Sequence, residues 1–133
     1  MDDCIFCKLA SRELPTHKIY EDSYAFAFLD KHPIKPGHIL VIPKIHEPDF
    51  YNLDEEHYRQ LMSAVQRLSK IVNEKMHPKK VGLIVAGWDI PHAHIHIVPM
   101  HDYHDITSKS FLDGKRANPS DGELAETARL LLS

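Results

Sequence analysis

The stretch His92-Ala93-His94-Ile95-His96-Ile97-Val98 determines how the rest of this chain of 133 residues is interpreted. Its histidines alternate with apolar residues, which is the period of a β-strand, where successive side chains point to opposite faces. We expect the three histidines to share one face, about 7 Å apart, while the apolar residues between them pack on a core. The segment therefore predicts a half-buried strand that presents three imidazoles in a row.

The residues alone leave three interpretations of the histidine face open. It can be the solvent face of an ordinary strand. It can supply the ligands of a hydrolase-type zinc site, although neighbouring positions on one strand point roughly parallel and seldom converge on one ion without another element. It can also act in covalent catalysis, because an imidazole near neutral pH serves as a nucleophile or a proton donor.

The composition limits the class of protein. Hydrophobic residues make up 43% of the chain and charged residues 26%, and the length suits one domain over residues 1–133. The net charge of −3 argues against general binding to nucleic acid or to an anionic membrane. No apolar run approaches the roughly 20 residues that span a bilayer. Because the acidic start of the chain also lacks the features of a secretory signal, we expect a cytoplasmic protein.

The hydrophobic pattern predicts an α+β fold with an antiparallel sheet. We expect strands at residues 18–20, 24–29, 38–42, 81–86 and 92–98. The short connection between the last two favours an antiparallel hairpin.

Three segments are predicted to be helical. Apolar spacings of three and four between Asp54 and Met76 mark a long amphipathic helix, for which Asn52 or Asp54 is the expected N-cap. Shorter helices are expected at residues 5–13, ended by Leu14-Pro15, and at 123–132. Residues 101–133 are expected to form a variable C-terminal tail, in which His101 and His104 are solvated loop residues.

The two cysteines of the chain lie close together, at Cys4 and Cys7. In a cytosolic protein this spacing indicates a metal half-site or a redox pair rather than a structural disulfide. A zinc site needs two further ligands, and eleven histidines are available to supply them.

Three segments together resemble the histidine triad superfamily, and most of all its branch of small Hint-like nucleoside phosphoramidate hydrolases. They are Cys-Ile-Phe-Cys at 4–7, Pro-Gly-His-Ile-Leu-Val-Ile-Pro-Lys-Ile-His at 36–46, and the triad followed by Val98-Pro99. The resemblance covers residues 4–99. It implies a nucleotide-binding homodimer whose two sheets join into one larger sheet. It also implies a hydrolase or transferase that cleaves nucleoside 5′-monophosphate derivatives at the α-phosphate.

The resemblance implies a role for three histidines. The family's nucleophile is the middle histidine of the triad, here His94, which forms a covalent nucleotidyl-histidine intermediate that water then hydrolyses. His96 is placed to contact the phosphate and the bridging atom of the leaving group, and His38 matches an upstream active-site histidine. The expected substrate is a phosphoramidate or acyl-adenylate type of purine nucleoside monophosphate derivative, and no Mg²⁺ is required.

The family's nucleoside pocket corresponds to two short segments of this chain. The resemblance places the base and ribose against Ile5, Phe6, Leu9, Phe28, Leu29 and Asp30. Asp30 is then able to accept two hydrogen bonds from the ribose hydroxyls. On the residues alone, the apolar members of this set are ordinary core residues, and Asp30 is a loop cap before a proline-rich turn.

Family members that begin with Cys-x-x-Cys resemble this chain in a zinc site. The ligands implied here are Cys4, Cys7, His46 and His92. Two thiolates and two imidazoles make a closed tetrahedral set, which is typical of a structural ion. The alternative is a pair of reduced, buried thiols without a metal.

The segment before the triad departs from the family pattern. The family carries an Asn on the preceding strand and a longer, glycine-rich turn with a Gly-Gln pair, whereas residues 85–91 are Val-Ala-Gly-Trp-Asp-Ile-Pro. An ionised Asp89 cannot donate a hydrogen bond to a phosphate and would repel one that it faced. Either it points away, or phosphate binding relies more on His38, His96 and backbone N–H groups. Met100 also replaces a common arginine. Two alternatives therefore stand beside the main prediction: a zinc-stapled nucleotide-binding module with little turnover, and a dinucleoside polyphosphate hydrolase.

Overall fold

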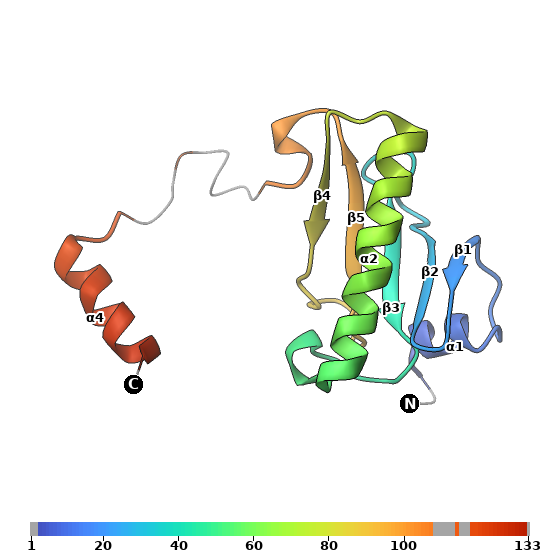
Figure 1. The fold of residues 1–133 in the computed structure, drawn as a ribbon, viewed down its shortest axis with the longest axis horizontal. Helices are drawn as coiled ribbons and strands as arrows, with labels where there is room; N and C mark the ends of the chain where they lie inside the picture. Colours follow the sequence, from blue (N-terminus) through green and yellow to red (C-terminus); the bar gives the residue numbers. More distant parts are fainter. Residues whose placement is uncertain (1–2, 108–113, 115–117, 133) are drawn as a thin grey trace.

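The protein is described by a computed structural model that covers residues 3–107, 114 and 118–132. Five strands form one antiparallel sheet in the order β1-β2-β3-β5-β4 (Figure 1). The strands are β1 (Lys18–Glu21), β2 (Ala25–Leu29), β3 (Ile39–Pro43), β4 (Lys80–Ile84) and β5 (Ile95–Met100). With the long helix beside them, they confirm the predicted α+β fold.

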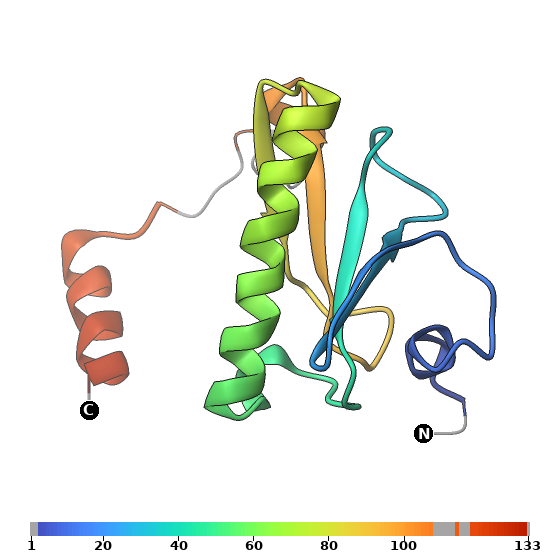
Figure 2. The same ribbon diagram turned by 45° about the vertical axis from the view of Figure 1, so that its right-hand side comes forward.

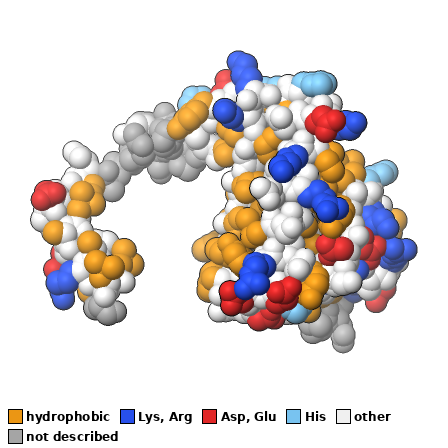
Figure 3. Space-filling model, in the orientation of Figure 1, with side chains coloured by type: hydrophobic (Ala, Val, Ile, Leu, Met, Phe, Trp, Pro, Cys, Tyr) orange, Lys and Arg blue, Asp and Glu red, His pale blue; other side chains and the backbone are white. Residues whose placement is uncertain are grey.

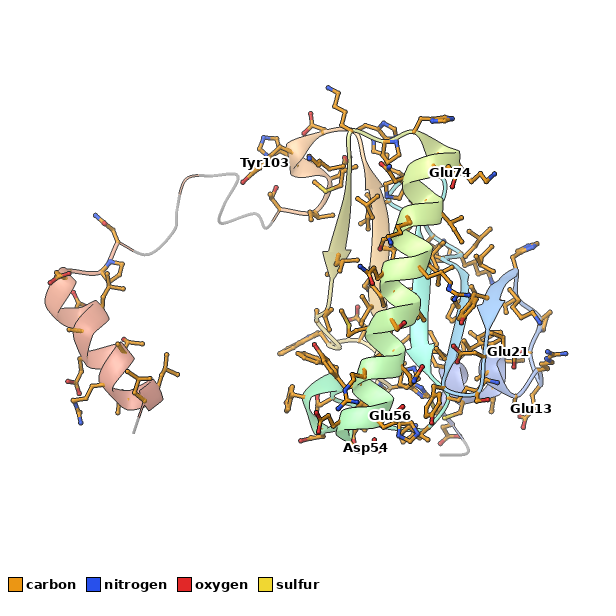
Figure 4. The ribbon with its side chains drawn as sticks, viewed as in Figure 1. Glu13, Glu21, Asp54, Glu56, Glu74 and Tyr103 are labelled. Carbon is orange, nitrogen blue, oxygen red and sulfur yellow. The ribbon has the colours of Figure 1, made fainter. Side chains whose placement is uncertain are left out.

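The long helix α2 (Glu55–Met76) covers one face of the sheet. The predicted N-cap is Asp54, whose carboxylate accepts the backbone N–H of His57 at 2.9 Å (Figure 4). The helix ends where His77 adopts a left-handed φ of 51°, just before Pro78. Its buried stripe packs on alternate residues of β2, β3 and β5, which gives a core of Ala25, Ala27, Ile39, Val41, Leu61, Ala64, Val65, Leu68, Val72, Ile95 and Ile97.

The short helix α1 (Ile5–Ala10) lies on the opposite face of the sheet, as Figure 2 shows. It packs on the side chains that alternate with those of the α2 core. This second cluster consists of Cys4, Phe6, Leu9, Phe26, Phe28, Leu40 and Ile42. The face that carries α1 is also the face toward which His96 points, because its neighbours Ile95 and Ile97 belong to the α2 core.

Helix α1 is three residues shorter than the predicted helix over residues 5–13. Arg12 adopts a left-handed φ of 67°. The N–H of Glu13 then bonds the carbonyl of Lys8 at 2.9 Å, and that of Arg12 bonds the carbonyl of Leu9 at 3.2 Å. This pair of bonds is a Schellman motif. The helix therefore ends before Pro15 is reached.

The prediction of one strand over residues 92–98 was wrong at its start, because β5 begins at Ile95. The N–H of His92 bonds the carbonyl of Ile90 at 2.8 Å, and that of Ala93 bonds the carbonyl of Glu47 at 2.7 Å. These amides are therefore unavailable to β3. His92 and His94 lie on an irregular segment, and the rings of His94 and His96 are 5.2 Å apart rather than stacked in a regular row.

The remaining elements follow the predictions closely. Strand β4 ends at Ile84, two residues early, and pairs antiparallel with β5 as predicted. Helix α4 (Asp121–Leu132) includes the predicted helix over 123–132 and lies apart from the sheet in Figures 1 and 2. Residues 108–113 and 115–117 of the predicted tail lie outside the described residues. No helix among the described residues has the length and apolar character needed to cross a membrane.

The charged side chains are mixed on the face that carries α2. Figure 3 shows acidic and basic side chains interspersed there, with no large patch of one sign. This distribution agrees with the small net charge of −3.

Replacing the N-cap of α2 is expected to destabilise the protein. Asp54→Ala removes the acceptor for the amide of His57, so we expect the free energy of unfolding to fall by about 1 kcal/mol in urea denaturation. Asp49→Ala is the matched control, since Asp49 precedes the short 3-10 helix η1 (Phe50–Asn52) without a side-chain cap bond. Equal losses in the two variants would contradict the capping role.

Candidate functional site

A cavity of about 690 Å³ opens between α1 and the sheet. Its volume lies within the range of roughly 300–1,000 Å³ that is typical of small-molecule sites. Most of its wall is apolar, with histidines and carboxylates at one part of it. It is lined by Ile5, Phe6, Leu9, Leu14, Pro15, Thr16, Phe28, Leu29, Asp30, Lys31, His32, Leu40, Asp89, Ile90, His94 and His96.

His94 is held in one tautomer by the backbone. Its Nδ1 lies 2.8 Å from the carbonyl oxygen of His92. A carbonyl only accepts, so Nδ1 carries the proton and donates it. The lone pair of the neutral ring is then on Nε2. The edge contact with Phe6, whose ring centre is 5.1 Å away, packs the imidazole against α1. His94 therefore has the nitrogen and the orientation that a nucleophilic imidazole needs.

His96 is held in the opposite tautomer by His38. The backbone N–H of Ile34 donates to Nδ1 of His38 at 3.0 Å, so the proton of the neutral His38 ring is on Nε2. That nitrogen lies 2.9 Å from Nδ1 of His96, which must then accept. The proton of His96 is left on Nε2. The cavity is thus lined by one imidazole with a free lone pair and one with a free N–H.

Burial keeps the imidazoles of His38 and His96 neutral near neutral pH. Desolvation, with the neighbouring His94 and His38, lowers the pKa of His96 to about 4, against the opposing effect of the carboxylates of Asp30 and Asp89. Desolvation also lowers the pKa of His38, which is 2% exposed, although Asp30 opposes the shift. Neutral rings are what the assignment of tautomers requires.

The four predicted metal ligands come together at the start of α1. Cys4, Cys7, His46 and His92 place their ligand atoms within 4.8 Å of one another. Nδ1 of His92 lies 3.3 Å from Sγ of Cys4 and 3.4 Å from Sγ of Cys7, and Nδ1 of His46 lies 3.3 Å from Sγ of Cys7. A tetrahedral zinc ion with ordinary bond lengths holds sulfur and nitrogen ligands about 3.5 Å apart. The cluster therefore has the size that zinc requires.

The tautomer of His92 also suits a metal. Its Nε2 donates to the carbonyl oxygen of Pro43 at 2.8 Å, so the lone pair is on Nδ1, which faces the thiols. Burial, together with the hydrogen bond and charge of Cys4, raises the pKa of Cys7 to about 11. Deprotonation of the Cys7 thiol is therefore favoured by a cation beside it, which is what a bound zinc ion would supply.

Asp30, His38 and His96 form a second group whose ligand atoms lie within 4.8 Å of one another. Here the tautomers oppose metal binding. The Ile34 amide occupies the lone pair of His38 Nδ1, which leaves a proton rather than a lone pair on Nε2. A metal at Nε2 would require the loss of that backbone bond. We therefore assign this group to the hydrogen bond between His38 and His96, with the Asp30 carboxylate as a nearby charge whose Oδ2 is 3.4 Å from His38 Nε2.

The residues predicted for the nucleoside pocket all line the cavity. Phe6, Leu9 and Phe28 are largely buried and form its floor, whereas Ile5 is 47% exposed at the rim. Asp30 also performs the loop-cap role, because its Oδ1 accepts the backbone N–H of His32 at 2.8 Å. The core and pocket interpretations are thus compatible for these side chains.

Several contributors to the site carry no sequence signal. The groups that fix the tautomers are the amide of Ile34 and the carbonyls of Pro43 and His92, and a backbone group is the same in every residue. Pro15 was interpreted only as a helix stop, but it lines the cavity with its neighbours Leu14 and Thr16. The Schellman turn at Arg12 brings them there, and that turn was not predicted.

Comparison with known proteins identifies related sequences and related folds. Residues 11–103 match the HIT domain. The adenosine 5′-monophosphoramidase HNT1 of Saccharomyces cerevisiae is 33% identical over 100 residues, which cover 74% of this chain and 63% of the yeast protein.

Two solved structures extend the likeness to the fold. A HIT family member from Bacillus subtilis aligns with a TM-score of 0.83 and 28% identity, covering 98% of this chain and 95% of that chain. A zinc-bound histidine triad family protein from Mycobacterium smegmatis aligns with a TM-score of 0.70 and 26% identity, covering 97% and 98% of the two chains. The chain therefore belongs to the HIT family, the histidine triad proteins.

Proposed function

We propose that this HIT protein is a nucleotide-binding hydrolase that cleaves purine nucleoside 5′-phosphoramidates or acyl-adenylates at the α-phosphate. The reaction proceeds through a covalent nucleotidyl-histidine intermediate on His94. The observation that carries the proposal is the pair of opposed tautomers. The Nε2 lone pair of His94 and the Nε2–H of His96 are available in one cavity, and their rings are 5.2 Å apart.

The proposed reaction has two steps that use these nitrogens. Nε2 of His94 attacks the phosphorus, and the bond from phosphorus to the leaving group breaks. A leaving amine keeps that electron pair and takes the Nε2 proton of His96, whereas a leaving carboxylate departs with the pair as an anion that accepts a hydrogen bond from the same N–H. Water then attacks the phosphorus and the bond to His94 breaks. A proton of the water returns to Nε2 of His96 after loss of an amine, or passes to solvent after loss of a carboxylate. The products are the nucleoside monophosphate and the free amine or acid.

Positioning of the rings supplies much of the proposed catalysis. Phosphoryl transfer depends mainly on alignment and on donors around the phosphate oxygens. The carbonyl of His92 keeps the proton of His94 on Nδ1 throughout the attack. His38 acts through His96 by holding its Nδ1, at 2.9 Å. No Mg²⁺ is needed in this scheme.

The nucleoside is proposed to lie against α1 and the end of β2. The apolar side chains of Phe6, Leu9 and Phe28 offer flat surfaces for a base. Asp30 keeps acceptor capacity toward the ribose, since each carboxylate oxygen can accept more than one hydrogen bond. The base is expected to enter past the exposed side chains of Ile5 and Leu29.

A phosphoramidate or acyl-adenylate is the favoured substrate class. The similarity to the yeast protein named as an adenosine 5′-monophosphoramidase supports it. A dinucleoside polyphosphate has a strongly anionic leaving group, which the carboxylates of Asp30 and Asp89 would repel. The second candidate function is a nucleotide-binding module with little turnover, which is favoured by the replacement of a hydrogen-bond donor by Asp89.

We also propose that zinc is a structural ion bound by Cys4, Cys7, His46 and His92. A zinc ion there would tie the start of α1 to the end of β3 and to the irregular segment before β5. It would act on stability and on the placement of the triad, while His94 and His96 remain free for the reaction. The zinc-bound relative from Mycobacterium smegmatis supports this assignment.

A homodimer joined through the edge strand β4 completes the proposal. This strand lies at one edge of the sheet. Its side chain Leu83 is 43% exposed, and the following Val85 is 41% exposed. A second copy would bury these apolar groups and pair the backbone N–H and C=O groups along the edge of the sheet.

His94→Ala is expected to lower kcat for AMP release from adenosine 5′-phosphoramidate by roughly a thousandfold or more. AMP binding should persist, because the apolar floor and Asp30 are unchanged. Product release is measured by chromatography and AMP affinity by calorimetry.

The matched control is His101→Ala, which removes an exposed histidine outside the cavity and should leave kcat unchanged. Unchanged AMP release in His94→Ala would contradict the proposed intermediate. Binding of AMP without release by the unmodified protein would favour the nucleotide-binding module.

Removal of zinc is expected to destabilise the protein. The purified protein should contain about one zinc ion per chain, and chelation should lower its free energy of unfolding by about 3 kcal/mol or more. Cys4→Ser should lower both the metal content and the thermal midpoint. Metal content is measured by atomic emission and stability by thermal denaturation.

Turnover distinguishes the structural ion from a hydrolytic one. At a temperature where the chelated protein remains folded, AMP release should continue. Loss of turnover without loss of stability would instead indicate a catalytic ion.

A further inference from the structure

Asp89 is a charged residue of the cavity that takes no part in the bond-making steps of the proposed reaction. It lines the same cavity as His94 and His96, and its charge acts on the His96 imidazole. Among the described residues it has no hydrogen bond or ion pair, and its side chain is exposed. A carboxylate here has acceptors available to a ligand.

The second carboxylate of the cavity is already engaged. Asp30 accepts the amide of His32 at 2.8 Å through Oδ1, and its Oδ2 lies 3.4 Å from Nε2 of His38. The nearby cation Lys31 directly follows Asp30 and lines the same cavity. Asp89 belongs to another segment, between β4 and β5. Of the two carboxylates, it is therefore the one whose negative charge is balanced least by donors and cations of the protein.

The order of the groups along a bound substrate places the leaving group near Asp89. The nucleoside lies against α1 and β2 in the proposed complex, and the phosphorus is next to Nε2 of His94. The atom that bridges phosphorus and leaving group faces the Nε2–H of His96. Since Asp89 and His96 line the same cavity, substituents beyond the bridging atom enter the field of the Asp89 carboxylate.

The residue before Asp89 strengthens this argument. Trp88 is 91% exposed and is the one tryptophan of the chain. A carboxylate and an indole are the two side-chain groups best suited to bind an ammonium group, by charge pairing and by cation–π attraction. The segment Trp88-Asp89 thus has a carboxylate in the cavity wall and an exposed indole directly before it in the chain.

We propose that Asp89 selects the leaving group by charge, favouring substrates whose leaving group carries a protonated amine and rejecting anionic ones. This inference rests on the proposed function of the same cavity. This protonated amine takes no part in the reaction, because the bonds that form and break are those at phosphorus. Asp89 is therefore a specificity residue rather than a proton donor or nucleophile.

The expected effect follows from Coulomb attraction. Two unit charges roughly 6 Å apart, at an effective dielectric constant of about 40, change kcat/KM by about tenfold. A positive leaving group gains this factor over a neutral one, and a negative leaving group loses it. Added salt should reduce the preference, because the site is exposed.

The test uses three AMP phosphoramidates that differ only at the end of a short amine chain. The amines are 1,2-diaminoethane, propylamine and β-alanine, which give a positive, neutral and negative end. The unmodified protein should show kcat/KM values that fall in that order, by about tenfold at each step. Asp89→Asn should bring the three values within about threefold of one another, and Asp89→Lys should reverse the order.

Asp49→Asn is the matched control for a general effect of negative charge. Asp49 does not line this cavity but a separate, smaller one, with Phe50 and Tyr51. This variant should keep the preference of the unmodified protein. A preference that is unchanged in Asp89→Asn, or lost equally in Asp49→Asn, would overturn the inference.

Failure of the proposed function gives a different result. If no protein releases AMP from any of the three compounds, the reaction is contradicted. Selection by Asp89 is then judged by dissociation constants of the same compounds, measured through the fluorescence of Trp88. The same order of affinities, lost in Asp89→Asn, supports selection by charge, and equal affinities overturn it.

Discussion

The hydrogen bond from Nδ1 of His94 to the backbone carbonyl of His92, at 2.8 Å, is the interaction on which the site depends. A neutral imidazole has one proton and one lone pair, and this bond decides which nitrogen has which. Similar bonds fix His38 through the amide of Ile34 and His92 through the carbonyl of Pro43. With His96 held by His38, four histidines thereby have defined tautomers that differ without any change in residue identity.

Because β5 starts late, the first two histidines of the triad, His92 and His94, face different sites. The amides of His92 and Ala93 bond the carbonyls of Ile90 and Glu47 rather than β3. The ring of His92 faces the cysteines, while that of His94 lines the cavity. A regular strand would place both rings on one line. The irregular segment therefore allows neighbouring histidines to serve a candidate metal cluster and a candidate active site.

The sequence predicted the fold where periodicity is strong. The apolar spacing of α2 and the alternation across Ile95 and Ile97 are local patterns with one packing solution, and both were confirmed. The limits of α1 and β5 were missed because they depend on backbone bonds made by Arg12 and Ala93, which leave no pattern in the side chains. The grouping of Cys4, Cys7, His46 and His92 came from the family resemblance, since spacing cannot show which distant histidines meet.

The proposed reaction is tested most directly by long-range ¹H–¹⁵N correlation NMR of the histidine rings near neutral pH, with each ring assigned by substitution. We expect His94 to be protonated on Nδ1, whereas His38 and His96 should be protonated on Nε2. A proton on Nε2 of His94 in the folded protein would remove the lone pair from the cavity and contradict the proposed reaction at its first step.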